Sequence, residues 1–193
     1  MSNSMEFPDV MVDLETGGTS PDRTPIIQIA AVRFNLTKQT VDSNTFEACL
    51  RVPPHRFWDE STRTWWLGQK PHILEDIINR ARPYREVINE FYDWAVQTPS
   101  KHFWAKPISF DFAFLQSYFV DEQLPMPWSF RETMDVNTFI RSVHLPEAAP
   151  KVGITSGGDA HNALIDVFYQ IELVCKHYQL TKGVTNETQA THS

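Results

Sequence analysis

The sequence predicts an α/β fold in which helices flank a mixed β-sheet. The first half of the chain contains three strand-like segments joined by short polar connections, which indicates an antiparallel three-strand meander. The second half alternates helix-like and strand-like segments, which adds parallel strands to the meander. A chain of 193 residues has room for one such domain with a sizeable core.

The meander is predicted from alternating and β-branched residues. The segment "DVMVDLE" indicates a strand that starts near Val10, and the Gly-, Ser- and Pro-rich residues 16–25 indicate a loop. A second strand is expected over residues 26–36 and a third over residues 45–52. Because residues 37–44 form a short polar turn, these two strands should be antiparallel neighbours.

The remaining elements are predicted from helical spacing, caps and proline stops. The first helix is expected over residues 61–70, with Ser61 or Thr62 as its cap and Pro71 as its end. Further helices are expected over 72–81, 83–97, 109–120 with Ser109 as cap, 136–143 after the cap Asp135, and about 159–179. Residues 102–105 should form a short buried strand, and residues 147–158 a loop.

The folded domain is expected to cover residues 9–180, between a flexible segment 1–8 and a disordered tail 181–193. No apolar run reaches membrane-spanning length, and the start of the chain lacks a signal-peptide pattern. The two cysteines, Cys49 and Cys175, have apolar neighbours and no metal-site spacing, which fits buried thiols. We therefore expect no membrane partner and a cytoplasmic location, in a bacterium or in the host of a phage.

The formal net charge is −7, from 17 basic and 24 acidic residues. Taken alone, this charge argues against broad binding to a phosphate backbone. A protein that binds divalent cations carries surplus carboxylates, however, and its metal ions would restore the balance.

Asp13 and Glu15 form an Asp-x-Glu pair at the carboxyl end of the first predicted strand. Side chains two positions apart leave a strand on the same face, so the two carboxylates should point together. This end of a strand is where α/β folds commonly place ligand sites. Composition alone yields roughly three acid-x-acid pairs by chance, so a solvated pair at a strand edge stays an alternative.

Asp111 follows the strand at residues 102–105 and lies in the first turn of a predicted helix. It could be a carboxylate that interacts only with the helix dipole, an interaction worth about 0.3–1 kcal/mol. Its neighbours Phe110, Phe112 and Phe114 nevertheless make an apolar setting, in which a carboxylate needs a partner.

His161 and Asp166 lie at the start of the last predicted helix, in "HNALID". A His-x4-Asp match is expected about 0.4 times by chance in a chain of this composition, so it is weak alone. The combination of four acids and one histidine, each in an apolar frame, is stronger.

Four carboxylates brought together would repel one another, and their pKa values would rise. Divalent cations remove that repulsion, and oxygen ligands without cysteine favour Mg²⁺ or Mn²⁺ over Zn²⁺. Two such ions about 3.5–4 Å apart clamp the attacking and leaving oxygens of a phosphoryl displacement. A neutral histidine beside them can accept the proton of the attacking water.

With these residues in place, the sequence resembles the DEDDh branch of the DnaQ-like 3′–5′ exonucleases. The motifs read "VDLETGG", "ISFDFAFL" and "HNALID", in the family's order, and the resemblance extends from about Val10 to Gln179. The segments "TWWLGQ" and "WAKPISFD" are most similar to the small bacterial and phage members, the exonuclease VIII-like and exoribonuclease branch.

The resemblance implies an RNase H-like fold and the release of nucleoside 5′-monophosphates from the 3′ end of single-stranded nucleic acid. It implies that Asp13, Glu15 and Asp166 hold one metal ion. A second ion would be bound by Asp13 and reached by Asp111 through water, and His161 would be the general base.

The resemblance also implies contacts with the substrate. The backbone around Leu14 and Thr16 would meet the terminal sugar, and Phe110 would pack against the terminal nucleotide. Trp65 and Trp66 could stack on bases or pack in the core. Because adjacent helical residues face different ways, we expect one of each. Trp66 is the candidate for the nucleotide, and the sequence leaves open which of the two faces the cleft.

The chain departs from the family's pattern at three places, none of which is a predicted metal ligand. Thr19 stands where relatives often have an apolar wedge, Lys106-Pro107 where this branch tends to have Asn-Gly, and Gln28 where many relatives have glutamate. These departures bear on how the penultimate base is held.

Two other functions stay open at this stage. One is oligoribonuclease-type processing of short RNA, which chain-length dependence would separate from general exonuclease activity. The other is a non-catalytic nucleic-acid-binding or polymerase-associated subunit, against which the complete ligand set argues. The sequence chooses neither DNA nor RNA, because few contacts read the 2′-hydroxyl, and it leaves a homodimer open.

Overall fold

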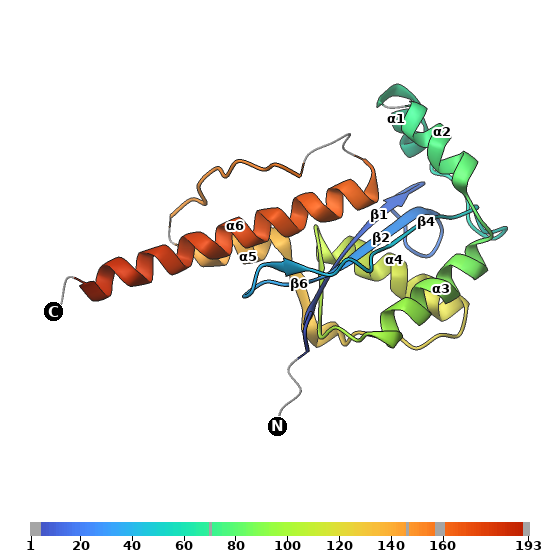
Figure 1. The fold of residues 1–193 in the computed structure, drawn as a ribbon. Coiled ribbons are helices and arrows are strands. Elements are labelled where there is room, and N and C mark those ends of the chain that lie inside the picture. The colour runs from blue at the N-terminus through green and yellow to red at the C-terminus, as the bar shows by residue number, and fades with distance from the viewer. Residues whose placement is uncertain (1–4, 70, 146, 157–160, 191–193) are drawn as a thin grey trace.

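The computed structural model describes residues 5–69, 71–145, 147–156 and 161–190. The elements follow one another in the predicted order of a meander and then alternating helices and strands (Figure 1). They are β1 (Asp9–Thr16), β2 (Ile26–Asn35), β3 (Thr40–Val41), β4 (Phe46–Cys49), α1 (Glu60–Gln69), α2 (Pro71–Arg80), α3 (Tyr84–Gln97), β5 (His102–Ala105), α4 (Ile108–Asp121), a 3₁₀ turn (Phe130–Glu132), β6 (Thr133–Asp135), α5 (Val136–His144) and α6 (Ala163–Ala190).

The strands form one mixed sheet in the order β3-β2-β1-β5-β6, with β4 also paired to β2. β2 is antiparallel to β1, β3 and β4, which is the expected meander. β5 is parallel to both β1 and β6, as crossover connections through helices require. The mixed α/β sheet predicted from the sequence is confirmed. β3 and β6 were not predicted, because two or three residues are too few to show an alternating pattern.

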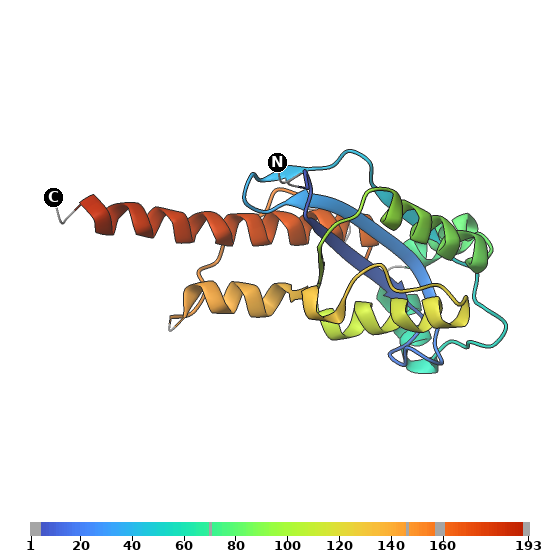
Figure 2. The same ribbon diagram turned by 90° about the horizontal axis from the view of Figure 1, so that it is seen from below.

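Side chains of β1 alternate between two hydrophobic cores. Val10, Val12 and Leu14 pack in the core that α3 and α4 cover. Met11 packs in the core beneath α5 and α6, which lie side by side on the other face of the sheet (Figure 2). Because side chains two positions apart share a face, Asp13 and Glu15 follow Met11 toward α6.

Several helix starts differ from the sequence prediction. Asp59, and not Ser61 or Thr62, caps α1, since its Oδ2 accepts the backbone N–H of Thr62 at 3.2 Å. Likewise Ser109 does not cap α4, which follows Pro107 directly.

Asp135 caps α5 as predicted. Its Oδ1 accepts the N–H of Thr138 at 2.7 Å, and its Oδ2 accepts the N–H of Ile108 at 3.1 Å. One carboxylate therefore supplies the acceptor at the start of two helices, which accounts for the missing side-chain cap of α4.

The last helix is displaced from its predicted limits. α6 begins at Ala163 because Asn162 caps it, with Oδ1 accepting the N–H groups of Leu164 and Ile165 at 3.2 and 3.3 Å. The predicted start at Asp159 lies outside the described residues. His161 precedes the helix and has a positive φ of 72°.

α6 also continues to Ala190, into the segment expected to be a disordered tail. Extending an existing helix costs little compared with nucleating one, and no proline interrupts this segment. The end of α6 projects well beyond the sheet in both views (Figures 1 and 2). Within the described part of the chain, no helix has both the length and the apolarity needed to cross a bilayer.

Candidate active site

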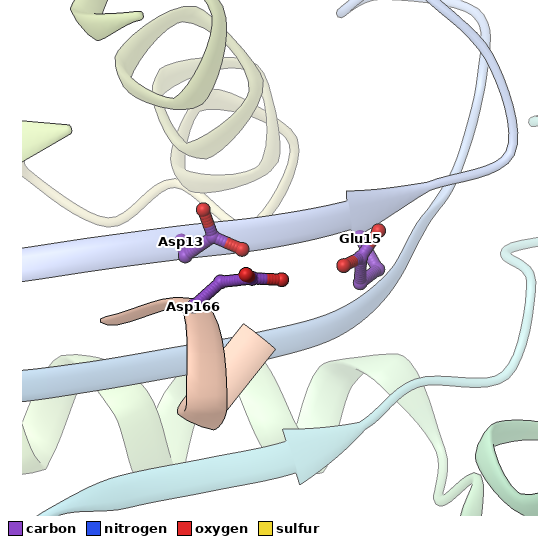
Figure 3. Close-up of side chains that lie close together, drawn as sticks. All are labelled: Asp13, Glu15 and Asp166. Carbon is purple, nitrogen blue, oxygen red and sulfur yellow. The ribbon is translucent and has the colours of Figure 1, made fainter. Parts of the chain in front are cut away.

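Three carboxylates from two distant parts of the chain meet above the sheet (Figure 3). Asp13 and Glu15 extend from β1, and Asp166 lies in the first turn of α6. One oxygen of each lies within 4.8 Å of the corresponding oxygens of the other two. The sequence predicted this convergence from the Asp-x-Glu spacing and from the apolar frame around Asp166.

Asp111 approaches β1 from the first turn of α4. β5 pairs with β1 only as far as Met11, which leaves the N–H of Leu14 without a strand partner on that side. Asp111 Oδ1 accepts this N–H at 3.1 Å, and the Asp111 side chain is almost fully buried. The carboxylate therefore completes the hydrogen bonding of β1 where the neighbouring strand has ended. It lies outside the group of three mutually close oxygens.

Burial and, for two of them, the neighbouring charges raise the pKa values of the carboxylates in this cluster. Burial raises the pKa of Asp13 well above its usual value, and the charges of Asp111, Glu15 and Asp166 add to that effect. Burial, followed by the charges of Asp166 and Asp111, raises the pKa of Glu15 to about 8. Burial also raises the pKa of Asp111 to about 7, although the N–H of Leu14 acts in the opposite direction.

Because these pKa values are raised, the cluster holds protons at neutral pH unless a cation replaces them. The donors are all carboxylate oxygens, which suits the hard divalent cations Mg²⁺ and Mn²⁺. The residues present therefore fit a divalent metal site.

Gln170 belongs to the cluster and was missed by the sequence analysis. It is buried, and its Nε2 donates to Asp13 Oδ1 at 2.7 Å. Its position four residues after Asp166 places it on the same face of α6 one turn later, and that spacing is the signal that could have identified it. The contact fixes one oxygen of Asp13.

Gln28 connects the sheet to the start of α6. It is fully buried and lies opposite Glu15 in the antiparallel register of β1 and β2. Its Oε1 accepts the N–H of Ala163 at 3.1 Å, and its Nε2 donates to Glu47 at 2.9 Å. A glutamate here would have no proton to donate to Glu47 when ionised, which explains why glutamine suits this chain.

His161 is held beside the cluster by its backbone and by its ring. Its N–H donates to Asp166 Oδ2 at 2.9 Å. Its imidazole meets the ring of Trp65 edge-on, with 4.7 Å between the ring centroids, while the ring of Trp66 is 6.1 Å away. A non-glycine residue with positive φ is uncommon and recurs at functional sites, where surrounding contacts hold it.

The structure corrects the assignment of Trp66 to the nucleotide. Only 1% of Trp66 is exposed, and its Nε1 donates to the carbonyl oxygen of Thr16 at 3.1 Å. Trp65 is 40% exposed and lies against His161, so Trp65 is the tryptophan with a surface open to a base. The expectation that one tryptophan packs in the core and one near the site agrees with this burial.

The other predicted nucleotide contacts are only partly open. The N–H of Leu14 is taken by Asp111, and Thr16 Oγ1 donates to the carbonyl of Gly18 at 2.7 Å. Phe110 is half-buried beside Asp111, with its ring 4.8 Å from that of Phe114. Contact of Leu14, Thr16 and Phe110 with substrate stays a prediction.

Residues 8–177 match the family described as "3'-5' exoribonuclease Rv2179c-like domain". None of the curated protein sequences compared with the chain matches it significantly. Among solved structures, the fold is similar to cell-death related nuclease 4, with a TM-score of 0.65, 15% identity, and 90% of this chain and 64% of that chain covered. Exonuclease I of E. coli in complex with a dA16 oligonucleotide gives a TM-score of 0.66 at 17% identity, covering 90% of this chain and 41% of that chain.

The nuclease domain of 3'hExo, a DEDDh family member bound to rAMP, gives a TM-score of 0.59 at 15% identity, with 90% and 93% of the two chains covered. These likenesses confirm the predicted RNase H-like, DnaQ-like fold. The chain spans about two-fifths of exonuclease I and 64% of cell-death related nuclease 4.

The two adjacent tryptophans should respond differently to the same substitution. Trp66→Ala should lower the free energy of unfolding by about 3–5 kcal/mol, because it leaves a cavity in the core beneath α1 and α2. Trp65→Ala should change it by about 1 kcal/mol or less, as is usual for a partly exposed side chain. Urea denaturation of both variants measures the difference, and equal losses would contradict the assigned burial.

The stability of the metal-free protein should fall as pH rises from about 5 to about 8. The pKa of Glu15 is higher in the folded than in the unfolded state, so the folded state binds more protons within this range. A tenfold difference in acid dissociation corresponds to about 1.4 kcal/mol. Denaturant unfolding with a chelator, at several pH values, measures the slope.

Glu15→Gln is the matched variant for this experiment, because it keeps the shape and removes the titrating group. Its stability should depend less on pH over the same range. If wild type and variant lose stability in parallel, the raised pKa assigned to Glu15 is wrong.

Proposed function

The chain belongs to the Rv2179c-like 3′–5′ exoribonuclease family, a family of phosphodiester hydrolases, and from this premise we propose that it removes nucleoside 5′-monophosphates from the 3′ end of single-stranded RNA. The observation that carries the proposal is the convergence of Asp13, Glu15 and Asp166 within 4.8 Å, next to buried Asp111. A structural relative bound to rAMP supports a ribonucleotide product.

We assign two divalent cations, Mg²⁺ or Mn²⁺, to the carboxylates. Asp13, Glu15 and Asp166 would hold one ion, and Asp13 with Asp111 would hold the other. When bound, such ions neutralise the carboxylates and stabilise the charge that develops on the phosphate and on the leaving oxygen. Gln170 fixes the Asp13 oxygen that it contacts and leaves the other for this task.

His161 is assigned the role of general base, which takes a proton from the attacking water. Its backbone bond to Asp166 and the ring of Trp65 hold the imidazole at the edge of the cluster. Trp65 would also present its exposed surface to a nucleobase, since stacking on an aromatic ring tolerates any base. Phe110 would pack against the terminal nucleotide from α4.

One gel tests the proposed function. Labelled single- and double-stranded RNA and DNA are incubated with Mg²⁺, Mn²⁺ or chelator, and the products are sized against mononucleotides. We expect ladders shortened from the 3′ end and mononucleotide product from single-stranded RNA, with nothing in chelator.

The same gel separates the alternatives. Activity confined to RNAs of a few nucleotides would indicate an oligoribonuclease-type enzyme. Faster cleavage of single-stranded DNA than of RNA would identify DNA as the substrate. A protein that binds RNA but releases no nucleotide with either metal would be a non-catalytic subunit, which contradicts the proposal.

His161→Ala should reduce turnover by about 10²–10⁴, the usual contribution of a positioned acid–base group. It should keep the stabilisation that Mn²⁺ gives to the wild type, because histidine is not among the assigned ligands. Single-turnover rates and thermal melts measure these two effects separately.

His55→Ala is the control for this variant. His55 is exposed and bonds to Asp121 at the far end of α4 from Asp111, so its loss should leave turnover unchanged. If His161→Ala cleaves as fast as His55→Ala, another group activates the water.

A further inference from the structure

We propose that Lys106 binds the phosphodiester group next to the one being cleaved, on the strand that remains after each cut, and that Tyr169 holds the lysine in place for this contact. The inference rests on the proposed function, because it concerns how the same site grips its substrate. It assigns a role to one of the three positions at which the chain departs from the family's pattern.

Strand register places Lys106 beside the carboxylates. In the parallel pairing of β1 and β5, Met11 lies opposite Trp104. Lys106 follows Trp104 by two residues, one residue past the end of β5, just as Asp13 follows Met11 by two residues. The chain then enters α4, whose first turn carries Asp111.

The contact with Tyr169 connects Lys106 to the other side of the cluster. Tyr169 follows Asp166 by three residues on α6 and immediately precedes Gln170, which bonds to Asp13. The ammonium nitrogen of Lys106 lies 5.5 Å from the centroid of the Tyr169 ring. The lysine is therefore positioned between the strand end and the helix that together carry the acids.

Among the residues that the structure describes, the ammonium group of Lys106 lies against an aromatic ring and not against a carboxylate. Many other cations of the protein face carboxylates: Arg56 is 2.6 Å from Asp121, and Lys176 is 2.6 Å from Glu172. Across the described residues, Lys106 has no such ion pair, and it is half-buried against an aromatic ring. A cation on a ring face keeps its charge available to an anion.

An acidic site needs such a charge to hold a polyanion. The protein carries a net charge of −7, and phosphate contacts by lysine and arginine provide much of the affinity for nucleic acid. A strand that is cut from its 3′ end has a hydroxyl beyond the last nucleotide, so the only phosphates outside the reacting one lie upstream. A cation at the edge of the cluster that does not contact the reacting phosphate can therefore meet only the next phosphodiester along the remaining strand.

Two short RNAs isolate this contact. The dinucleotide ApA without a 5′-phosphate contains only the phosphodiester that is cut, whereas ApApA contains the neighbouring one as well. Lys106→Gln should lower kcat/KM for the first cut of ApApA roughly tenfold, mainly through KM, as expected for loss of one charge-assisted contact. Its kcat/KM for ApA should stay within about twofold of the wild type.

Substitutions on both partners complete the design. A neutral methylphosphonate at the upstream linkage of ApApA should slow the wild type as much as Lys106→Gln does, and should slow Lys106→Gln no further. Lys101→Gln removes the same charge at a lysine that faces Glu132, and should leave kcat/KM for both substrates unchanged.

Tyr169→Phe should keep the wild-type KM for ApApA because the ring remains, and Tyr169→Ala should raise this KM. Thermal melts confirm that each variant is folded.

Three outcomes overturn the assignment. Equal losses on ApA and ApApA would mean that Lys106 acts on the reacting phosphate or on the fold. If Lys106→Gln cleaves ApA and ApApA with the wild-type kcat/KM, as Lys101→Gln should, Lys106 makes no contact with the upstream phosphodiester. A wild-type protein that cleaves neither these RNAs nor a longer single-stranded RNA would overturn the proposed function itself, which is a separate result from either of these.

Discussion

The repulsion among four carboxylates gathered at the end of β1 is the constraint on which the rest of the site depends. Burial raises the pKa values of Asp13, Glu15 and Asp111, and the neighbouring carboxylate charges raise those of Asp13 and Glu15 further. A fold that selected only for stability would separate these groups or pair them with arginine. Here the buried arginines lie elsewhere: Arg33 pairs with Asp42, and Arg56 pairs with Asp121. Because no arginine in the described part of the chain neutralises the cluster, its carboxylates can bind divalent cations, on which the proposed hydrolysis depends.

Neutral hydrogen bonds hold the carboxylates in place without removing their charge. The N–H of Leu14 contacts Asp111, the amide of Gln170 contacts Asp13, and the N–H of His161 contacts Asp166. Gln28 and Asn162 fix the start of α6, and Asp135 fixes the start of α4. Two helices from distant parts of the chain are thereby oriented toward one strand end. A preorganised site of this kind needs little rearrangement when cations bind.

The sequence predicted the parts of the structure that depend on local periodicity. Alternation predicted β1, β-branched residues predicted β2, and the polar turn after β2 predicted the return through β4. The i, i+2 spacing placed Asp13 and Glu15 on one face. The sequence could not distinguish Trp65 from Trp66, because a short helix without a clear apolar face does not reveal which side meets the core. The positive φ of His161 was missed because it accompanies a contact with Asp166, and the local cap at Asn162 was passed over for an earlier start near Asp159. Gln170 was missed because an amide attracts attention only when its partner is known.

Metal-dependent thermal stability tests the central claim most directly. In a chelated sample and in millimolar Mn²⁺, the wild type should differ by several degrees in Tm, since binding to the folded state alone adds about 2.7 kcal/mol at a hundredfold excess over Kd. Asp166→Asn should melt higher than wild type in chelator, because repulsion is reduced, and should lose most of the Mn²⁺ shift. Asp76→Asn, at an exposed carboxylate that pairs with Arg80, should keep the full shift. Equal Tm values for the wild type with and without Mn²⁺, or a full shift in Asp166→Asn, would contradict the account.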